Sequence, residues 1–519
     1  MNSSQKPRVC ISLCEPTLAA IERVAKTVWA DDLIEVRLDC LDLTELQTAA
    51  ASITKLLQEI SCEVILTLRP PAEGGRHQLT DDQRREFWSS AIFSNSLFDV
   101  ELDLAEKFNS EAASSSLPID WRRTICSYHD FTTVPAQLDH IYERLAATPA
   151  RVLKIAVQAQ DVTDCLPMFY LLERAGAEGR ELIAIAMGAA GVATRILGPS
   201  RGAYLTYASV DEKNATAPGQ ISSKELRSIY RVENITRHSE IFGLMGMPVS
   251  HSLSPRMHNA AFAAAGKDAV YIPFEVGDAG AFITRMVHPR TRELDWNLRG
   301  LSITAPHKSI VMDHLDWIDD AATQIGAVNT VVVENDQLHG YNTDACGFLA
   351  PLEKKLGNLR DARCAIIGAG GAASAALWAI RKAHGTATVF ARDTLNATAI
   401  EQRFSAQCMK LEGARFRDFD VVVNATPLGT VGEFENETPA SASQLRGARL
   451  VYDLVYNPVE TRFLREAREA GCDVLNGLAM LVAQASEQFK LWTEAYPPEN
   501  VMHEAAQPAF VKRGSLENG

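Results

Sequence analysis

The sequence predicts an α/β protein in which a (β/α)8 barrel precedes a two-domain half with an α/β substrate domain and a Rossmann domain. Three observations carry this prediction. The chain has 519 residues, enough for about three domains. Up to residue 210, short apolar runs alternate with helix-like stretches. From Cys364 an apolar run leads into GAGGAA and an alanine-rich helical pattern, which is the order of a dinucleotide-binding unit.

The barrel prediction depends on eight short apolar, β-branched runs. They begin near Val9, Leu33, Glu63, Leu97, Arg123, Arg151, Glu181 and Ala203. Helix-like stretches such as Pro16–Ala30 and Pro135–Ala147 separate most of them. Eight such strands in little more than 200 residues favour a barrel over its rival, a doubly wound sheet.

The polar segment around Val232–Ser239 marks the first domain boundary. We therefore expect the barrel to occupy residues 1–235 and a substrate domain to occupy residues 239–345. A Rossmann domain should follow over 346–476, and C-terminal helices at about 477–495 should complete the substrate domain. Residues 496–519 are rich in Pro, Glu and Gly and are expected to form a mobile tail.

Composition excludes several classes of function. A hydrophobic fraction of 46% with 22% charged residues is ordinary for a soluble globular protein. The net charge of -14 argues against nucleic acid or an anionic membrane as a partner. The N-terminus lacks a signal sequence and no apolar stretch is long enough for a membrane span, so a cytoplasmic location is expected. The ten cysteines include no CxxC pair, which predicts buried or free thiols in a reducing compartment.

Charged residues alternate along two of the expected barrel strands. Glu35, Arg37 and Asp39 alternate in the first, and Asp99 and Glu101 alternate in the second, followed by Asp103. A solvent-exposed strand face is the simplest explanation for a single strand. Helices cover the outside of a barrel, however, so these charges should point inward, where they need partners or a ligand.

Lys154 is the most informative residue of the first half, because it lies within the apolar strand RVLKIAVQ. A buried lysine has a lowered pKa and a nucleophilic amine, which suits imine formation with a ketone. A lysine that only extends to solvent is the alternative. His129 ends the neighbouring strand RTICSYHDF and could move a proton beside such an imine, although a lone histidine is more often structural.

The first half resembles the type I 3-dehydroquinate dehydratases, which are (β/α)8 barrels. The matching segments, in order, are EVRLD (35–39), LRPPAEGG (68–75), DVE (99–101), SYHDF (127–131), LKIA (153–156), MGAAGVATR (187–195) and APGQIS (217–222). The resemblance implies that Lys154 forms a Schiff base, that His129 removes a proton, and that Glu101 orients His129. It also implies a group of substrate-binding residues: Glu35, Arg37, Arg69, Arg195, Thr216 and Gln220. Thr194 and Thr216 replace serines that are usual in the family, and both keep a hydroxyl group.

The second half begins with Ser252 and Ser254 in a loop before a helical pattern. These hydroxyls could bind a carboxylate or only cap the helix. Further on, Lys308 in SITAPHK and Asp344 in GYNTDACGF could share a proton during hydride transfer to a ketone. A simple salt bridge is the alternative for this pair.

The glycine-rich segment GAGGAA (368–373) lies between an expected strand and an expected helix. Backbone N–H groups at such a helix start can face a pyrophosphate. After the next strand, Arg392 could bind a 2′-phosphate, whereas Asp393 would suit a ribose hydroxyl. We expect Arg392 to face the ribose and Asp393 to face solvent, because adjacent residues at a strand end point in opposite directions.

The second half resembles the shikimate dehydrogenases. GAVNT (326–330), NATPLG (424–429), YDLVYNP (452–458) and NGLAMLVAQASEQF (476–489) match in order. The resemblance implies Lys308 and Asp344 as the catalytic pair. It implies substrate binding by Ser252, Ser254, Thr304, Asn329, Tyr456 and Gln484. It implies binding of NADP by Gly368, Gly370, Gly371, Ala372, Ala373, Arg392, Thr426 and Gly477. Ala391 and Asp393 depart from the family's usual Asn and Thr.

Together the two resemblances imply a bifunctional enzyme of the shikimate pathway that needs no metal. Its barrel would convert 3-dehydroquinate to 3-dehydroshikimate, which its second half would reduce to shikimate with NADPH. Two alternatives remain open: a second half that prefers quinate and NAD, and an inactive regulator built on the same folds. The presence of Lys154, His129, Lys308 and Asp344 argues against the regulator. The oligomeric state is not determined by the sequence.

Overall fold

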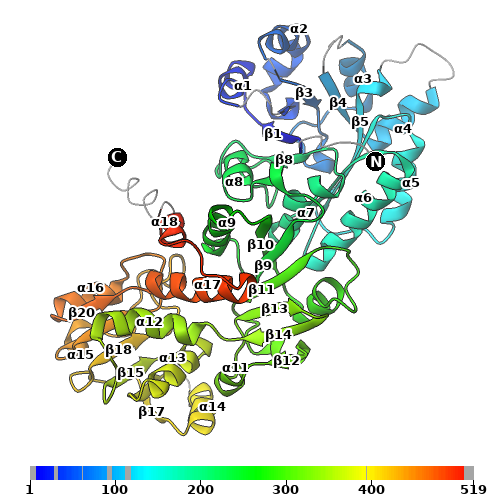
Figure 1. Ribbon diagram of the computed structural model, residues 1–519. Helices are drawn as coiled ribbons and strands as arrows, with labels where there is room; N and C mark the ends of the chain where they lie inside the picture. Colours follow the sequence, from blue (N-terminus) through cyan, green and yellow to red (C-terminus); the bar gives the residue numbers. More distant parts are fainter. Residues whose placement is uncertain are drawn as a thin grey trace. The chain divides into compact units, whose positions relative to one another are not determined.

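A computed structural model of the chain describes residues 7–28, 33–60, 62–90, 96–111, 119–392 and 394–507 (Figure 1). The chain folds as two compact units. The first consists of Met1–Ser239, Ile272–Met286 and Arg292–Asn297. The second consists of Glu240–Tyr271, Val287–Thr291 and Leu298–Gly519.

The first unit contains an eight-stranded parallel sheet with the order β7-β6-β5-β4-β3-β2-β1-β8. Its strands are β1 (Val9–Leu13), β2 (Leu33–Arg37), β3 (Val64–Thr67), β4 (Ser96–Glu101), β5 (Thr124–Asp130), β6 (Val152–Gln158), β7 (Glu181–Met187) and β8 (Thr206–Ala208). A bridge between Leu182 of β7 and Ala203 joins the two edges of the sheet. The predicted barrel is confirmed.

Helices follow the barrel strands as the sequence periodicity predicts. They are α1 (Leu18–Ala25), α2 (Leu43–Glu59), α3 (Asp81–Ser90), α4 (Leu102–Glu111), α5 (Leu138–Ala147), α6 (Leu166–Glu178), α7 (Val192–Leu197) and α8 (Ser223–Ser228). In α5 the buried residues Leu138, Ile141, Tyr142 and Leu145 recur at helical spacing, so one face of the helix packs inward.

The substrate-domain sheet of the second half has the order β10-β9-β11-β13-β14-β12. Its strands are β9 (Glu240–Gly246), β10 (Ala269–Glu275), β11 (Leu298–Ile303), β12 (Trp317–Ile318), β13 (Thr330–Glu334) and β14 (Gln337–Tyr341). The helices of this part of the chain are α9 (Ser254–Ala264), α10 (Ala279–Phe282), α11 (Asp320–Ile325) and α12 (Asp344–Leu356). Two further helices lie at the C-terminal end, α17 (Gly477–Thr493) and α18 (Val501–Ala506).

A further sheet, which lies within the second unit, is parallel and has the Rossmann order β17-β16-β15-β18-β19-β20. Its strands are β15 (Arg363–Ile367), β16 (Thr386–Ala391), β17 (Gln407–Lys410), β18 (Val421–Asn424), β19 (Leu450–Asp453) and β20 (Asp473–Leu475). The helices are α13 (Gly371–Lys382), α14 (Thr394–Phe404), α15 (Ala442–Leu445) and α16 (Arg462–Glu469). Cys364 and Ile366 face one apolar cluster, while Ala365 and Ile367 face another. Helices therefore cover both faces, which explains the continuous apolar run of β15.

The prediction of a mobile tail from residue 496 is wrong for the last described helix. Met502 and Ala506 of α18 are buried in the apolar cluster that contains Met257 and Phe262 of α9. The two residues are four apart, so they share one helical face that the overall polar composition concealed. Residues 508–519 of the predicted tail lie outside the described residues.

Two cysteines correct the expectation of free thiols. Cys14 and Cys40 follow the adjacent strands β1 and β2, and their Cα atoms are 5.2 Å apart in a disulfide. Parallel pairing of β1 with β2 brings these strand ends together, a proximity that spacing along the chain does not reveal.

None of the helices within the described residues combines the length and the apolar content that crossing a lipid bilayer requires.

The packing of α18 gives a test of stability. Met502→Ala should lower the free energy of unfolding of the second unit by about 2–4 kcal/mol, because it leaves a cavity in a closed core. Glu504→Ala, on the exposed side of the same helix, should change it by less than about 0.5 kcal/mol. Urea unfolding followed by tryptophan fluorescence measures both, and equal effects would contradict the packed helix.

Candidate active sites

The barrel interior has an apolar layer and, two residues further along each strand, a polar layer. The apolar layer includes Cys10, Leu33, Ile65, Leu97, Ile125 and Val152. The polar layer consists of Ser12, Glu35, Thr67, Asp99, Ser127 and Lys154, all of them buried. Residues two apart point to the same face of a strand, so both layers face inward. The polar layer lies toward the carboxyl ends of the strands, where barrels of this kind carry their active sites.

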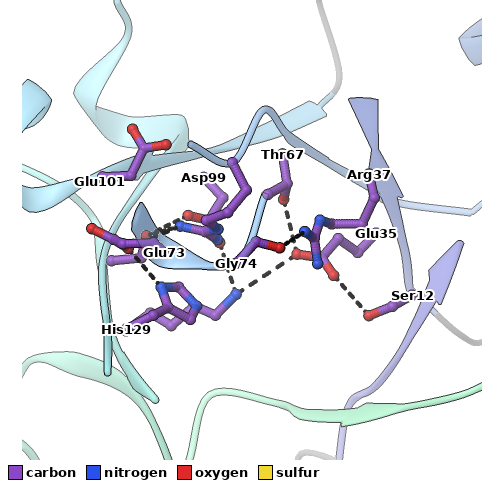
Figure 2. A network of polar contacts seen from close by, with 12 residues as sticks. Ser12, Glu35, Arg37, Thr67, Glu73, Gly74, Asp99, Glu101 and His129 are labelled. Atoms are coloured by element: carbon purple, nitrogen blue, oxygen red, sulfur yellow. Dashed lines mark hydrogen bonds and ion pairs between the residues drawn. The ribbon is translucent and has the colours of Figure 1, made fainter. Parts of the chain in front are cut away.

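Lys154 joins the carboxylates of this polar layer. Its Nζ donates hydrogen bonds to Asp99 Oδ2 at 2.8 Å and to the Tyr207 hydroxyl at 3.1 Å. Glu35 Oε1 lies 3.7 Å from the same nitrogen, and Figure 2 labels the two carboxylates, Asp99 and Glu35. A buried amine needs such partners. Lys154 is therefore held in one place inside the barrel.

Asp99 is shared between Lys154 and Arg69. Arg69 Nη2 lies 2.8 Å from Asp99 Oδ2, and Ser127 donates a hydrogen bond to Asp99 Oδ1 at 2.6 Å. Burial alone would raise the pKa of Asp99, but Arg69 and Lys154 hold that pKa well below its usual range. Asp99 is consequently an anion between two cations.

His129, at the end of β5, contacts Glu73 rather than Glu101. His129 Nδ1 lies 2.9 Å from Glu73 Oε2 (Figure 2). Glu73 ends the short helix η2 (Pro71–Glu73) after β3. Gly74 follows with a positive φ of 83°, a conformation that glycine adopts without strain. The turn between β3 and α3 thus supplies the partner of the histidine.

The prediction that Glu101 orients His129 is not supported by the geometry. Glu101 Oε2 lies 2.7 Å from Arg84 Nη1 of α3, and both side chains are buried. In Figure 2, no dashed line joins Glu101 to any residue drawn. Glu101 is the last residue of β4, and its carboxylate forms an ion pair with the helix that precedes this strand.

Burial shifts the pKa values of His129 and Glu73 in opposite directions. Burial, reinforced by the positive charges of Arg69 and Lys154, lowers the pKa of His129 well below its usual value. Burial raises the pKa of Glu73 to about 8, although Arg69 opposes the shift. The imidazole is therefore neutral at pH 7, as a proton acceptor must be.

The guanidinium of the buried residue Arg195 contacts a carbonyl group. Its Nη2 donates to the Pro218 carbonyl at 3.2 Å, and its Nε has no hydrogen-bond partner among the described residues. Burial lowers the pKa of Arg195 to about 10, and no carboxylate counters the shift. Its unbalanced charge suits an anionic group of a ligand.

Three other predicted barrel residues have partners within the protein. Arg37 forms two hydrogen bonds of 2.8 Å with Asp39, through Nε and Nη2. The Gln220 side-chain oxygen accepts hydrogen bonds from the Thr216 backbone N–H at 2.7 Å and hydroxyl at 3.2 Å. These contacts orient both groups.

A cavity of about 680 Å³ in the second unit brings together the predicted substrate-binding residues and catalytic pair of that half. They are Ser252, Ser254, Thr304, Lys308, Asn329, Asp344, Tyr456 and Gln484. Ala372, Thr426 and Gly477, predicted to bind a dinucleotide, line the same cavity. The cavity thus places groups suited to two ligands side by side.

Lys308 and Asp344 form a hydrogen-bonded pair in this cavity, 2.5 Å apart. Asn329 donates to the other carboxylate oxygen, Asp344 Oδ1, at 2.8 Å. Asp344 is the first residue of α12, where the positive end of the helix dipole favours its negative charge. Lys308 therefore has a fixed acceptor for its proton.

The glycine-rich turn between β15 and α13 borders a neighbouring cavity of about 470 Å³. Gly370, Gly371 and Ala372 line it together with Lys308. Gly370 precedes α13 and makes no side-chain cap, so the first N–H groups of the helix remain available for an anion. Within the described residues, no group of three or more His, Cys, Asp or Glu side chains could hold a metal ion.

Three predicted cofactor residues lie apart from these cavities. Gly368, with a φ of 119°, shapes the turn, because a Cβ there would approach the Ala425 carbonyl oxygen to 2.9 Å. The Ala373 side chain is buried in the Rossmann core, so a contact of Ala373 with a cofactor through its backbone stays a prediction. Arg392 follows β16 and is exposed, whereas Asp393 lies outside the described residues.

Family models match both halves of the chain. Residues 9–237 match type I 3-dehydroquinase, 244–331 match the shikimate dehydrogenase substrate binding domain, and 477–507 match the shikimate 5′-dehydrogenase C-terminal domain. The chloroplastic bifunctional 3-dehydroquinate dehydratase/shikimate dehydrogenase of Arabidopsis thaliana is 30% identical over 517 residues, which cover 94% of this chain and 83% of that protein. The chain belongs to the bifunctional 3-dehydroquinate dehydratase/shikimate dehydrogenase family.

Separate relatives match the shikimate dehydrogenase half. The shikimate dehydrogenase (NADP(+)) of Methanococcus aeolicus is 37% identical over 281 residues, which cover 52% of this chain and 98% of that protein. A crystal structure of shikimate dehydrogenase in complex with NADP+ aligns with a TM-score of 0.50 at 34% identity. It covers 53% of this chain and 97% of that one.

Two residues of the candidate sites were not predicted from the sequence. Glu73 stands in the LRPPAEGG segment, four residues after Arg69, where two glycines fold the turn back toward the strand end. Gln488 lines the large cavity, where its amide donates to the Asn329 carbonyl and accepts from Ser302. It lies one helical turn beyond Gln484, a spacing that could have indicated it.

The raised pKa of Glu73 predicts how barrel stability depends on pH. Because the fold favours the protonated carboxyl group, Glu73 contributes stability that is present at pH 4 and lost as pH rises through about 8. Glu73→Gln should remove this loss. The unfolding free energy of the wild type minus that of the variant should thus fall by about 1–3 kcal/mol between pH 4 and 9.

Urea unfolding at several pH values, followed by circular dichroism, measures this difference. Glu86→Gln changes an exposed carboxylate on α3 and serves as the matched control. A difference for Glu73→Gln that stays constant with pH would show that the fold does not perturb this carboxyl group.

Proposed function

We propose that the chain catalyses two successive steps. The barrel converts 3-dehydroquinate to 3-dehydroshikimate, and the second unit reduces 3-dehydroshikimate to shikimate with NADPH. The observation that carries the first step is Lys154, buried and 2.8 Å from Asp99. The observation that supports the second is the Lys308–Asp344 pair in a cavity beside the glycine-rich turn. Family membership supports both activities.

In the barrel, Lys154 Nζ passes a proton to the ketone oxygen as it adds to the ketone carbon, and loss of one water leaves a protonated imine. The protonated imine withdraws electrons from the neighbouring C–H bond. When Glu73 is ionised, His129 donates from its Nδ1–H to that carboxylate and takes the substrate proton through Nε2. Because burial raises the pKa of Glu73 to about 8, the share of this form grows as the pH rises toward 8. The same proton then leaves with the substrate hydroxyl as water, and hydrolysis of the imine returns Lys154. Arg195 binds the substrate carboxylate through its unbalanced charge.

In the second unit, Lys308 gives a proton to the ketone oxygen as reduction proceeds, and Asp344 holds Lys308 in place. Asn329 fixes the carboxylate, and Gln484 in turn accepts from Asn329 at 3.4 Å. Ser252 and Ser254 supply hydroxyl groups for the substrate carboxylate. NADPH supplies the hydride when bound. The fit of the dinucleotide rests on the open N-terminus of α13 at the glycine turn.

A cytoplasmic location stays a prediction, and the name of the Arabidopsis relative places that protein in the chloroplast.

The two activities should be separable by single substitutions. Lys308→Ala should slow turnover in the reduction by about 10²–10⁴-fold, since the proton donor is lost, and leave dehydration unchanged. His129→Ala should have the reverse effect. Lys355→Ala removes an exposed lysine of α12 and should affect neither. NADPH oxidation and the absorbance of the enone product follow the two steps. Parallel loss of both activities in a folded variant would contradict separate sites.

Cofactor preference tests the role of Arg392. A guanidinium paired with the 2′-phosphate contributes about 1.5–3 kcal/mol. Arg392→Ala should therefore reduce the NADPH-to-NADH ratio of kcat/KM by about 10–100-fold and spare the use of NADH. Arg417→Ala, at an exposed position of the same domain, is the control. A wild type that prefers NADH, or an unchanged ratio in Arg392→Ala, would contradict this role.

A further inference from the structure

The ion pair between Arg84 and Glu101 lies beside the barrel site without touching its reactive groups. Arg84 Nη1 and Glu101 Oε2 are 2.7 Å apart, and the residues are 7% and 3% exposed. A buried ion pair is costly, and apolar side chains of similar size often replace one without loss of stability. Simple packing therefore does not explain the charges at this position.

Glu101 is close enough to act on the site through its charge. It stands two residues after Asp99, on the same face of β4. Its negative charge raises the pKa of Arg69 and also the pKa of Glu73. Arg84 acts in the opposite direction, because its positive charge lowers the pKa of Glu101, which burial raises.

We propose that Arg84 and Glu101 are a positioning pair for dehydration, in which Arg84 balances the charge of Glu101 so that Glu73 stays available to His129. The proposal rests on the dehydratase function proposed above. Neither residue contacts the substrate. Arg84 lies on α3. Besides its ion pair with Glu101 of β4, Arg84 donates a hydrogen bond of 2.8 Å to Asp81 on its own helix. The pair thus connects a helix outside the barrel to a proton transfer inside it.

Other charges also face Glu73, and the experiment must leave them in place. Arg69 follows β3 and lowers the pKa of Glu73, whereas Asp99 and Glu101 of β4 and Asp103 of α4 raise it. His129 of β5 contacts it directly. The test substitutions below alter only Glu101 and Arg84, and the control alters Arg85.

The pH profile of dehydration distinguishes this role from the alternatives. Glu101→Gln removes a negative charge and leaves Arg84 unbalanced, so Glu73 should ionise more readily. The acid limb of the pH profile, which is the fall of kcat/KM at low pH, should then move to lower pH by roughly 0.5–1 unit. The plateau turnover rate should stay within about threefold of the wild type, because Glu101 does not touch the reacting atoms.

A second substitution should reverse the shift. Arg84→Met in the Glu101→Gln background removes the unbalanced cation, so the acid limb should return toward its wild-type position. Arg84→Lys alone keeps the charge and should leave the limb in place, which tests the proposal even if Glu101→Gln does not fold. Arg85→Met, on the same helix, is the control for a nearby loss of positive charge.

Each outcome either supports the pair or overturns it. If Glu101→Gln slows the plateau turnover rate at least about 100-fold and Arg84→Met does not restore it, Glu101 acts on His129 or the substrate directly. If the acid limb does not move in Glu101→Gln, or if it moves in Arg84→Lys, then the pair is only a structural contact. Absence of dehydration in the wild type would instead refute the proposed function, and urea unfolding followed by circular dichroism reports whether the barrel of each variant is folded.

Discussion

The shared ion pair of Lys154, Asp99 and Arg69 determines the rest of the barrel site. Placing a lysine amine inside a closed barrel requires a carboxylate beside it, because an unpaired buried charge is too costly. Asp99 meets this need, and Arg69 keeps the carboxylate ionised from the other side. The two positive charges in turn act on His129 and help to keep its imidazole neutral. One buried anion thus influences both the nucleophile and the base.

Lys308 of the second unit lies in a different environment from Lys154. Lys308 is paired with Asp344, as Lys154 is with Asp99, but its side chain is 24% exposed in an open cavity. The two environments match the two roles we propose. A lysine that forms a covalent bond is enclosed by the barrel, while one that only passes a proton can stand at the edge of a cavity shared by two ligands. This difference follows from the folds, since a barrel encloses its centre. The cavity around Lys308, by contrast, is lined by residues of both the substrate domain and the Rossmann domain.

The sequence predicted the features that follow from periodicity along one strand or helix. The alternation around Glu35 and Asp99, and a lysine in an apolar strand, were sufficient to indicate the charged barrel interior. Contacts between distant segments were harder to predict. Glu73 reaches His129 from a turn, and Glu101 pairs with a helix earlier in the chain. Such contacts depend on how loops close over the strands, so only the folded structure distinguishes Glu73 from Glu101 as the partner of His129. The same is true of the Cys14–Cys40 disulfide.

Covalent trapping of the substrate tests the central claim, that Lys154 is a nucleophile held by its buried carboxylates. Sodium borohydride added together with 3-dehydroquinate should reduce the imine and stop dehydration. Mass spectrometry of the digested protein should then find the reduced ligand on the peptide that contains Lys154, and no adduct should form in Lys154→Ala. Full dehydratase activity after this treatment, or an adduct on another lysine, would contradict the account.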